Sequence, residues 1–239
     1  MLEAVFISDL HLHPNEPLIT ERFNQFVDWA LLNTKNVYIL GDFFHAWPGD
    51  DALDAWSLSI VQQLKKLSQA GLSVFFMHGN RDFLIGTKLI RQAGMTLLNE
   101  PTIIQLANMP VLLVHGDRYC LLDKSHQRFR RFTRNKWFSR LFLRLPFNFR
   151  NRLVAGVREF SQANRKKEMT VMDVVPEAML AHMETNKVMT LIHGHTHKPG
   201  LTQYDFKNAV YKQYILSDWD ESPQLLCYHN TKGLYYIQS

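Results

Sequence analysis

Short apolar runs separated by polar and glycine-containing segments recur along this 239-residue chain. Runs of this length that are rich in Val, Ile, Leu and Phe predict buried strands. Five of them are residues 3–9, 37–42, 72–80, 110–115 and 189–195. Stretches with helical spacing of apolar positions lie between the first runs, at about 19–31, 54–70 and 86–93. Alternating strands and helices predict an α/β fold with a largely parallel core sheet.

The pattern changes after residue 115. Residues 122–172 have no strand signal, many arginines and a cluster of aromatic side chains, and they predict an inserted helical unit. A further helix is predicted over 176–186, since proline suits the first helical turn. Beyond the last of the five runs, short β-rich segments alternate with turn signals and predict antiparallel strands of a second sheet, at 210–217, 224–229 and 234–238.

Charge is distributed unevenly over these segments. Residues 118–167 contain 15 Lys or Arg and two acids, whereas the remainder contains 12 basic and 20 acidic residues. The net charge of +5 therefore conceals a mildly acidic body with one strongly basic segment. Such a segment is a candidate surface for phosphates, nucleic acid or an anionic membrane. We divide the chain into a core formed by residues 1–121 and 173–239 and a basic cap insertion at 122–172.

Composition argues against several classes of protein. The two cysteines, Cys120 and Cys227, are too few for a disulfide framework and lack the paired spacing of a zinc site, which favours a reducing compartment. No stretch approaches the roughly 18 uninterrupted apolar residues that suggest a membrane span. The chain enters a predicted strand at once, without the basic and apolar regions typical of a signal peptide.

Side chains typical of metal ligands come at the end of each of the five strand-like runs. The carboxyl ends of parallel strands meet on one rim of an open α/β sheet, where such folds place their sites. Carboxylate, imidazole and amide ligands without thiolate suit Mn²⁺, Fe²⁺ or Zn²⁺. Two such ions side by side serve in-line displacement at phosphorus. The seven candidate ligands are Asp9, His11, Asp42, Asn80, His115, His195 and His197.

The spacing of the ligands predicts how they are shared between two ions. Two pairs are two residues apart, Asp9 with His11 and His195 with His197. Because alternate residues of a strand point the same way, we expect each pair to grip one ion. Asp42 stands alone and could bridge both ions. His193 is expected to be a packed, hydrogen-bonded histidine and Asp117 a loop residue behind the ligands.

The ordered blocks D-x-H, G-D, G-N-x-D, H and G-H-x-H resemble those of the calcineurin-like metallophosphoesterase family, over nearly the whole chain outside the insertion. The resemblance implies an α/β sandwich of two facing β-sheets flanked by helices, here with a helical cap insertion. It also implies a dinuclear centre on one rim, with two divalent ions that we expect to be Mn²⁺. Asp42 would bridge the ions, one held by Asp9, His11 and His197 and the other by Asn80, His115 and His195.

Further blocks are similar to the branch of this family that hydrolyses UDP-2,3-diacylglucosamine, a lipid-linked nucleotide sugar. They are residues 38–51, 78–84, 94–98, 172–174 and 192–199. The similarity implies cleavage of the pyrophosphate to UMP and diacylglucosamine 1-phosphate by attack of activated water at the α-phosphorus, in lipid A biosynthesis. Arg81 would contact phosphate through its planar guanidinium. The other implied substrate contacts are Asn80, His195, Asp123, Ser161, Asn164 and Lys167, while His126 stands where that branch often has tyrosine.

The cap insertion is compatible with a lipid substrate. Aromatic residues alternate with arginines over residues 129–152, a pattern typical of amphipathic helices on an anionic bilayer. We therefore expect a peripheral protein on the cytoplasmic side of the bacterial inner membrane, with no nucleic-acid partner and no obligate protein partner. In the structural alternative, the aromatic side chains pack the insertion onto the body and the arginines are solvated.

Two other functions stay open at this point. A metal-dependent nuclease or nucleotide phosphodiesterase would use the basic segment to bind a nucleic-acid backbone, with steep salt dependence. A binding scaffold that keeps the fold but has lost catalysis would usually lack ligands, whereas all seven positions are filled here.

Overall fold

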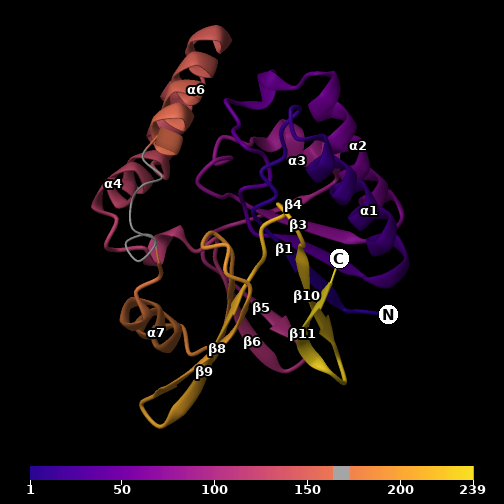
Figure 1. Cartoon of the computed structure of the whole chain (residues 1–239), viewed down its shortest axis with the longest axis vertical. Coiled ribbons are helices and arrows are strands. Elements are labelled where there is room, and N and C mark those ends of the chain that lie inside the picture. Colours follow the sequence, from indigo (N-terminus) through magenta and orange to yellow (C-terminus); the bar gives the residue numbers. More distant parts are fainter. Residues whose placement is uncertain (164–172, 239) are drawn as a thin grey trace.

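Two β-sheets pack face to face in the computed structural model, with helices on their outer sides, as the sequence predicted (Figure 1). The structure describes residues 1–163 and 173–238, without the side chains of residues 136 and 160–163. The first sheet has six strands, in the spatial order β11 (Gly233–Gln238), β10 (Gln224–His229), β1 (Ala4–Ile7), β2 (Asn36–Ile39), β3 (Ser73–Met77) and β4 (Thr96–Leu98). Strands β1 to β4 run parallel, and β10 and β11 complete the sheet as antiparallel neighbours.

The second sheet contains the strand that carries the Gly-His-x-His block. Its five strands, in spatial order, are β5 (Thr102–Leu106), β6 (Met109–Leu113), β7 (Thr190–His193), β9 (Ala209–Ile215) and β8 (Gly200–Phe206). Strands β6, β7 and β9 are parallel, whereas β5 and β8 are antiparallel to their neighbours. The carboxyl ends of β6 and β7 therefore face the same rim of the molecule.

Alternation along the strands builds the layers of the sandwich. In β1, Val5 and Ile7 pack under the helices of the first sheet, whereas Phe6 packs between the two sheets. Leu191 of β7 packs under the helix of the second sheet, and its neighbour Ile192 packs between the sheets. Each central strand is thus buried on both faces, which explains its continuous apolar sequence.

Four helices cover the outer faces of the sheets. Helices α1 (Pro17–Asn33), α2 (Ala55–Gln69) and α3 (Thr87–Ala93) lie over the first sheet, and α7 (Pro176–Thr185) lies over the second. Pro17 stands in the first turn of α1, and Asp54 caps α2 through a reciprocal pair of hydrogen bonds with Ser57. Two short 3₁₀ helices, η1 (Asp50–Ala52) and η2 (Asp117–Tyr119), lie in the rim loops.

The described part of the insertion, residues 122–163, is largely helical, as the sequence predicted. It contains α4 (Lys124–Thr133), α5 (Lys136–Phe142) and α6 (Phe147–Ala163), and α6 projects away from the sheets (Figure 1). Arg150 anchors α6 to the core: its buried guanidinium donates to the Pro48 carbonyl oxygen and pairs with Asp51. The boundaries drawn at residues 121 and 172 stay predictions.

The strands at the end of the chain correct one expectation. They were expected to share the second sheet, but only β9 lies there, next to β8, whereas β10 and β11 join the first sheet beside β1. Turn signals indicate antiparallel neighbours without indicating the sheet. Strand β10 is buried on both faces, with Leu225 toward the helices and Leu226 between the sheets, so it fits inside a covered sheet. The short strands β4, β5 and β8 were not predicted.

Candidate metal centre

The seven candidate ligands lie in five loops at one rim of the sandwich. The strands end before the ligands, at Ile7, Ile39, Met77, Leu113 and His193. The first ligand of each loop follows its strand by two or three residues. The rim prediction therefore describes the architecture correctly, whereas the predicted strands were too long at this end.

Asp9 and His11 lie in one group of potential ligands, whereas His195 and His197 lie in different groups, which corrects the expectation that each pair grips one ion through strand alternation. The backbone at most of the ligands is left-handed and not extended as in a strand. Five of the seven ligands have positive φ angles: Asp9 (56°), His11 (52°), Asp42 (52°), His195 (69°) and His197 (56°). This conformation costs roughly 1–2 kcal/mol for a residue with a Cβ atom. Such backbone is retained where the surrounding structure holds it, and it clusters at functional sites.

The ligand atoms form two neighbouring clusters. One contains Asp9, His11 and His197 and the other contains Asp42, His115 and His195, and within each the candidate ligand atoms lie within 4.8 Å of one another. In the first, His197 Nε2 is 3.4 Å from Asp9 Oδ1. Asn80 joins the second, because its Oδ1 atom is 2.9 Å from His115 Nε2.

Asp42 lies between the two clusters. Its Oδ2 atom is 3.3 Å from Nε2 of His11, and its Oδ1 atom is 3.7 Å from Nε2 of His115. The carboxylate is nearly fully buried, and each of its oxygen atoms faces one cluster. This is the arrangement expected of a carboxylate shared by two cations.

The polar atoms in both clusters fit a bound cation. Asp9 Oδ1 is buried and has no hydrogen-bond partner among the described residues, whereas Asp9 Oδ2 accepts from Ser8 Oγ and from the His195 backbone N–H. His115 Nδ1 lies 2.8 Å from the Leu40 carbonyl oxygen and donates to it in the neutral tautomer. Its Nε2 and Asn80 Oδ1 are then two acceptors that need a proton or a cation between them.

Carboxylates attract positive charge at two of the four candidate histidine ligands, whereas burial lowers the pKa of His11 and lowers that of His195 to about 3. Burial alone would lower the pKa of His115, but the carboxylates of Asp42 and Asp9 raise it to about 9. Burial likewise opposes the charged form of His197, but the neighbouring carboxylates of Asp218 and Asp9 raise its pKa to about 10. Both of these rings, His115 and His197, therefore lie where carboxylates attract positive charge.

Residues behind the ligands fix their orientation. Nδ1 of His197 is 3.2 Å from Asp218 Oδ2, so the Nε2 atom faces Asp9. The sequence reasoning missed Asp218, although it follows β9 as the other ligand loops follow their strands. His193 is fully buried, as expected: its Nδ1 contacts the Gly194 carbonyl oxygen, and its Nε2 accepts from Gln213 Nε2.

Asp82 ties two ligand loops together and was also missed. Its carboxylate accepts from the backbone N–H of Phe43 at 2.8 Å and of Gly79 at 2.7 Å. Burial and the neighbouring charge of Asp42 raise the pKa of Asp82 to about 7. The block Gly-Asn-Arg-Asp thus supplies an orienting carboxylate beside the ligand Asn80.

Arg81 points at the same centre. Its Nε atom is 3.2 Å from Asp42 Oδ2, and its backbone N–H donates to Asp42 Oδ1 at 2.9 Å. The guanidinium is mostly buried, with 14% of its side chain exposed. The guanidinium of Arg81 therefore lies beside the carboxylate that faces both clusters.

The other predicted substrate contacts are only partly described. Asp123 caps α4 by accepting from the His126 backbone N–H at 3.0 Å. The ring of His126 lies 5.4 Å from that of His195, at the edge of the second cluster. Ser161 lies at the end of α6 and its side chain is not described, and Asn164 and Lys167 lie outside the described residues.

Comparisons with known proteins agree with this centre. A model of the family described as calcineurin-like phosphoesterase matches residues 3–199. The UDP-2,3-diacylglucosamine hydrolase of Pseudomonas aeruginosa (strain UCBPP-PA14) is 43% identical over 220 residues, which cover 92% of each chain. Proteins with the same name from Cellvibrio japonicus and Pectobacterium carotovorum are 43% and 40% identical over 91% and 94% of each chain.

Proposed function

The chain belongs to the calcineurin-like phosphoesterase family, and from that premise we propose that it hydrolyses the pyrophosphate bond of UDP-2,3-diacylglucosamine. The products are UMP and 2,3-diacylglucosamine 1-phosphate, and the reaction belongs to lipid A biosynthesis. The observation that carries this proposal is the shared carboxylate of Asp42 between two clusters of ligands. The identity of 40–43% over more than nine tenths of both chains supports the choice of substrate.

In this proposal, Asp9, His11 and His197 would hold one Mn²⁺ ion, and Asn80, His115 and His195 would hold the other, with Asp42 available to both. Two bound divalent cations supply Lewis acidity toward phosphate oxygens and lower the pKa of the attacking water. The chain contributes the geometry. Its left-handed loops hold the imidazoles at fixed angles, and the Leu40 carbonyl and the Asp218 carboxylate orient the Nε2 atoms of His115 and His197.

Arg81 neutralises the phosphate on which charge accumulates. We expect Arg81→Ala to lower kcat/KM for the lipid substrate by roughly 10²–10³-fold, the range for removal of one preorganised donor at such a site. Bound metal, counted after dialysis, should not change, because a guanidinium has only donors and cannot itself bind a cation. Arg91→Ala, at an exposed position in α3, is the matched control and should behave like wild type. An unchanged kcat/KM in Arg81→Ala would remove this residue from the mechanism.

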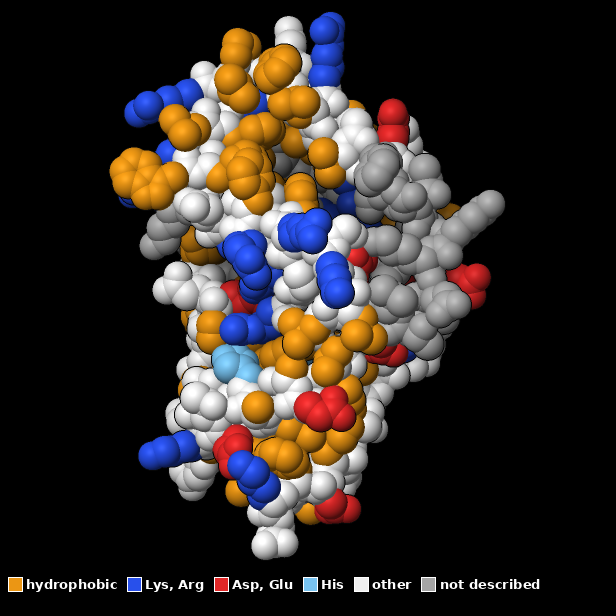
Figure 2. All heavy atoms as spheres, turned by 90° about the vertical axis from the view of Figure 1, so that its left-hand side faces the viewer, with side chains coloured by type: hydrophobic (Ala, Val, Ile, Leu, Met, Phe, Trp, Pro, Cys, Tyr) orange, Lys and Arg blue, Asp and Glu red, His pale blue; other side chains and the backbone are white. Residues whose placement is uncertain are grey.

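We also propose that the cap brings the enzyme to an anionic membrane, on the cytoplasmic side of the inner membrane. No helix in the described part of the chain is long and apolar enough to cross a bilayer. Hydrophobic side chains gather on the upper part of the face in Figure 2, with Lys and Arg side chains directly below them. The most exposed large apolar side chains of the cap include Trp137 (71%) and Leu141 (60%), on α5. Membrane insertion would bury this apolar surface beside basic groups that attract anionic headgroups.

Not every arginine of the cap is available to lipid. Arg150 is buried and serves as an anchor, and Arg130 and Arg134 pair with Glu100 in the core. The alternation of aromatic residues and arginines therefore combines structural pairs with exposed groups. The proposed membrane contact rests on the exposed apolar side chains of α5.

We expect the double variant Trp137→Ser, Leu141→Ser to bind anionic vesicles roughly 10²–10⁴-fold more weakly, because each lost side chain removes about 1.5–3 kcal/mol of burial. Turnover of lipid substrate in vesicles should fall, while turnover of a soluble phosphodiester should stay unchanged. Leu32→Ser removes an even more exposed apolar side chain, 78% exposed, from α1 of the core and serves as control. Equal vesicle binding by the control and the double variant would contradict the membrane proposal.

The proposed function is tested by incubating the purified chain with UDP-2,3-diacylglucosamine, Mn²⁺ and detergent and measuring UMP. We expect UMP release that EDTA abolishes and that added Mn²⁺ restores. A protein that binds metal but releases no UMP would redirect the search to nucleotides and nucleic acids. A protein that binds no metal would favour the scaffold without catalysis.

A further inference from the structure

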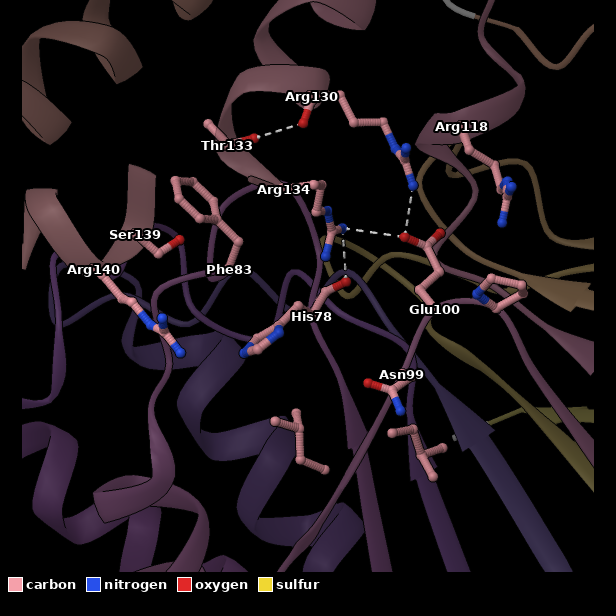
Figure 3. A pocket seen from close by; sticks show the side chains of 13 residues that line it. His78, Phe83, Asn99, Glu100, Arg118, Arg130, Thr133, Arg134, Ser139 and Arg140 are labelled. Atoms are coloured by element: carbon pink, nitrogen blue, oxygen red, sulfur yellow. Dashed lines mark hydrogen bonds and ion pairs between the residues drawn. The ribbon is translucent and has the colours of Figure 1, made fainter. Parts of the chain in front are cut away.

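Helix α4 is the first helix of the cap, and its polar side chains contact the loops that carry two of the candidate ligands. Arg130 bridges two carboxylates: its Nε donates to Asp117 Oδ1 at 3.0 Å and its Nη2 donates to Glu100 Oε2 at 2.8 Å. The second of these bonds is drawn in Figure 3. One turn earlier in the helix, Gln127 Nε2 donates to the Asp117 carbonyl oxygen at 2.7 Å. The helix is therefore fastened to the loop that follows β6.

Of the two carboxylates that pair with Arg130, one lies close to His115 in the sequence and the other accepts a hydrogen bond from its backbone. Asp117 follows His115 by two residues, and its side chain is fully buried. Glu100 lies between β4 and β5 with 5% of its side chain exposed, and its Oε1 accepts from the His115 backbone N–H at 3.2 Å. The guanidinium thus neutralises two buried carboxylates that would otherwise destabilise this loop.

Arg134, the C-cap residue of α4, makes the corresponding contact with the loop after β3. Its Nη2 donates to the His78 carbonyl oxygen at 3.0 Å and lies 3.5 Å from Glu100 Oε2, as Figure 3 shows. His78 precedes Asn80 by two residues. One helix of the cap therefore holds the backbone of both loops whose side chains, Asn80 and His115, meet at 2.9 Å.

We propose that Arg130 and Arg134 are positioning residues for the ion held by Asn80, His115 and His195, so that α4 is a structural part of that half of the metal centre. The inference rests on the proposed use of two ions and is independent of the substrate. The hydrogen bonds and ion pairs described for the other ligand set, Asp9, His11 and His197, are made to residues of the core. Loss of the α4 contacts should therefore affect the two ions unequally.

Two consequences follow from this arrangement. Coupling between sites is reciprocal, so the ion at the second cluster should stabilise α4 to the extent that α4 favours the ion. Lysine should replace Arg130 only in part, because separate nitrogen atoms of the guanidinium reach Asp117 and Glu100.

The test measures Mn²⁺ binding by equilibrium dialysis and follows the magnetically coupled ion pair by electron paramagnetic resonance. In Arg130→Gln and Arg134→Gln we expect one binding step at wild-type affinity and the other weakened by about 10–100-fold, the range for residues that orient metal ligands. Arg130→Lys should lie between these variants and wild type. Arg131→Gln is the matched control, since Arg131 is an exposed neighbour in α4 for which no hydrogen bond or ion pair is described.

A measurement on the unaltered chain covers the case in which a variant misfolds. Saturating Mn²⁺ should slow hydrogen exchange of the α4 amides more than that of the α7 amides. Wild-type affinities for both ions in the Arg130 and Arg134 variants, or α4 exchange that does not respond to Mn²⁺, would overturn this inference alone. A wild-type chain that binds no Mn²⁺ would overturn the proposed function together with it.

Discussion

Asp42→Asn should lower kcat for UDP-2,3-diacylglucosamine by at least roughly 10³-fold, which corresponds to about 4 kcal/mol in the activation free energy. The carboxylate is nearly fully buried, and its two oxygen atoms face Nε2 of His11 and Nε2 of His115. Asparagine has the same shape but carries no charge, and it replaces one of these oxygen atoms by an NH₂ group that cannot bind a cation. Turnover and bound metal are measured on the same preparation.

The matched control for this change is Asp28→Asn. Asp28 lies on the surface of α1, where its carboxylate pairs with Lys66 at 2.7 Å. Exposed ion pairs contribute between zero and about 1 kcal/mol to stability, so this variant should keep the activity and metal content of wild type. Wild-type turnover in Asp42→Asn would show that a shared carboxylate is not needed and would remove the central assignment of the proposed mechanism.

The sequence predicted the rim of the site but not the conformation of its loops. Apolar runs indicated which strands are buried, and the ligand types after each run placed all seven side chains at one end of the sandwich. The runs could not indicate where each strand stops, because Asp9 and Asp42 are as buried as the apolar residues before them. The left-handed backbone of these residues depends on hydrogen bonds between loops, for example from the Asp9 N–H to the Gly41 carbonyl oxygen.

Residues that act through a ligand were harder to predict than the ligands. Asp218 contacts His197 and Glu100 contacts His115, and each of these acids lies in a different loop from its histidine. No local spacing in the sequence therefore indicates either contact. The same limit applies to Arg130, which stood in a basic segment whose charge suggested an external partner, although its guanidinium pairs with two buried carboxylates. Charge patterning describes a segment as a whole, whereas the pairing of each charge depends on tertiary structure.

Replacement of Gly79 is the second change for which we expect a large loss of turnover, because this position has no room for a side chain. A Cβ atom built on Gly79 would lie 2.1 Å from Asp42 Oδ1 and 2.2 Å from the Asp42 backbone nitrogen. Real Cβ atoms essentially never make contacts this short, so the loop after β2 or the loop after β3 must move. The φ angle of Gly79 is not in the left-handed region, so the requirement is one of space. The glycine lets the loop with Asn80 approach the carboxylate that both ions share.

Gly79→Ala should therefore reduce turnover by at least about 10²-fold, since a shift of roughly 1 Å in a catalytic constellation has that effect. Overpacking at this buried contact should also lower the free energy of unfolding by about 1–3 kcal/mol. Gly156→Ala is the control: no heavy atom lies within 4 Å of its added Cβ, and alanine in helix α6 should stabilise by about 0.5–1 kcal/mol without changing activity. If Gly79→Ala retained wild-type turnover and full metal content, the close approach of these two loops would not be required for the reaction.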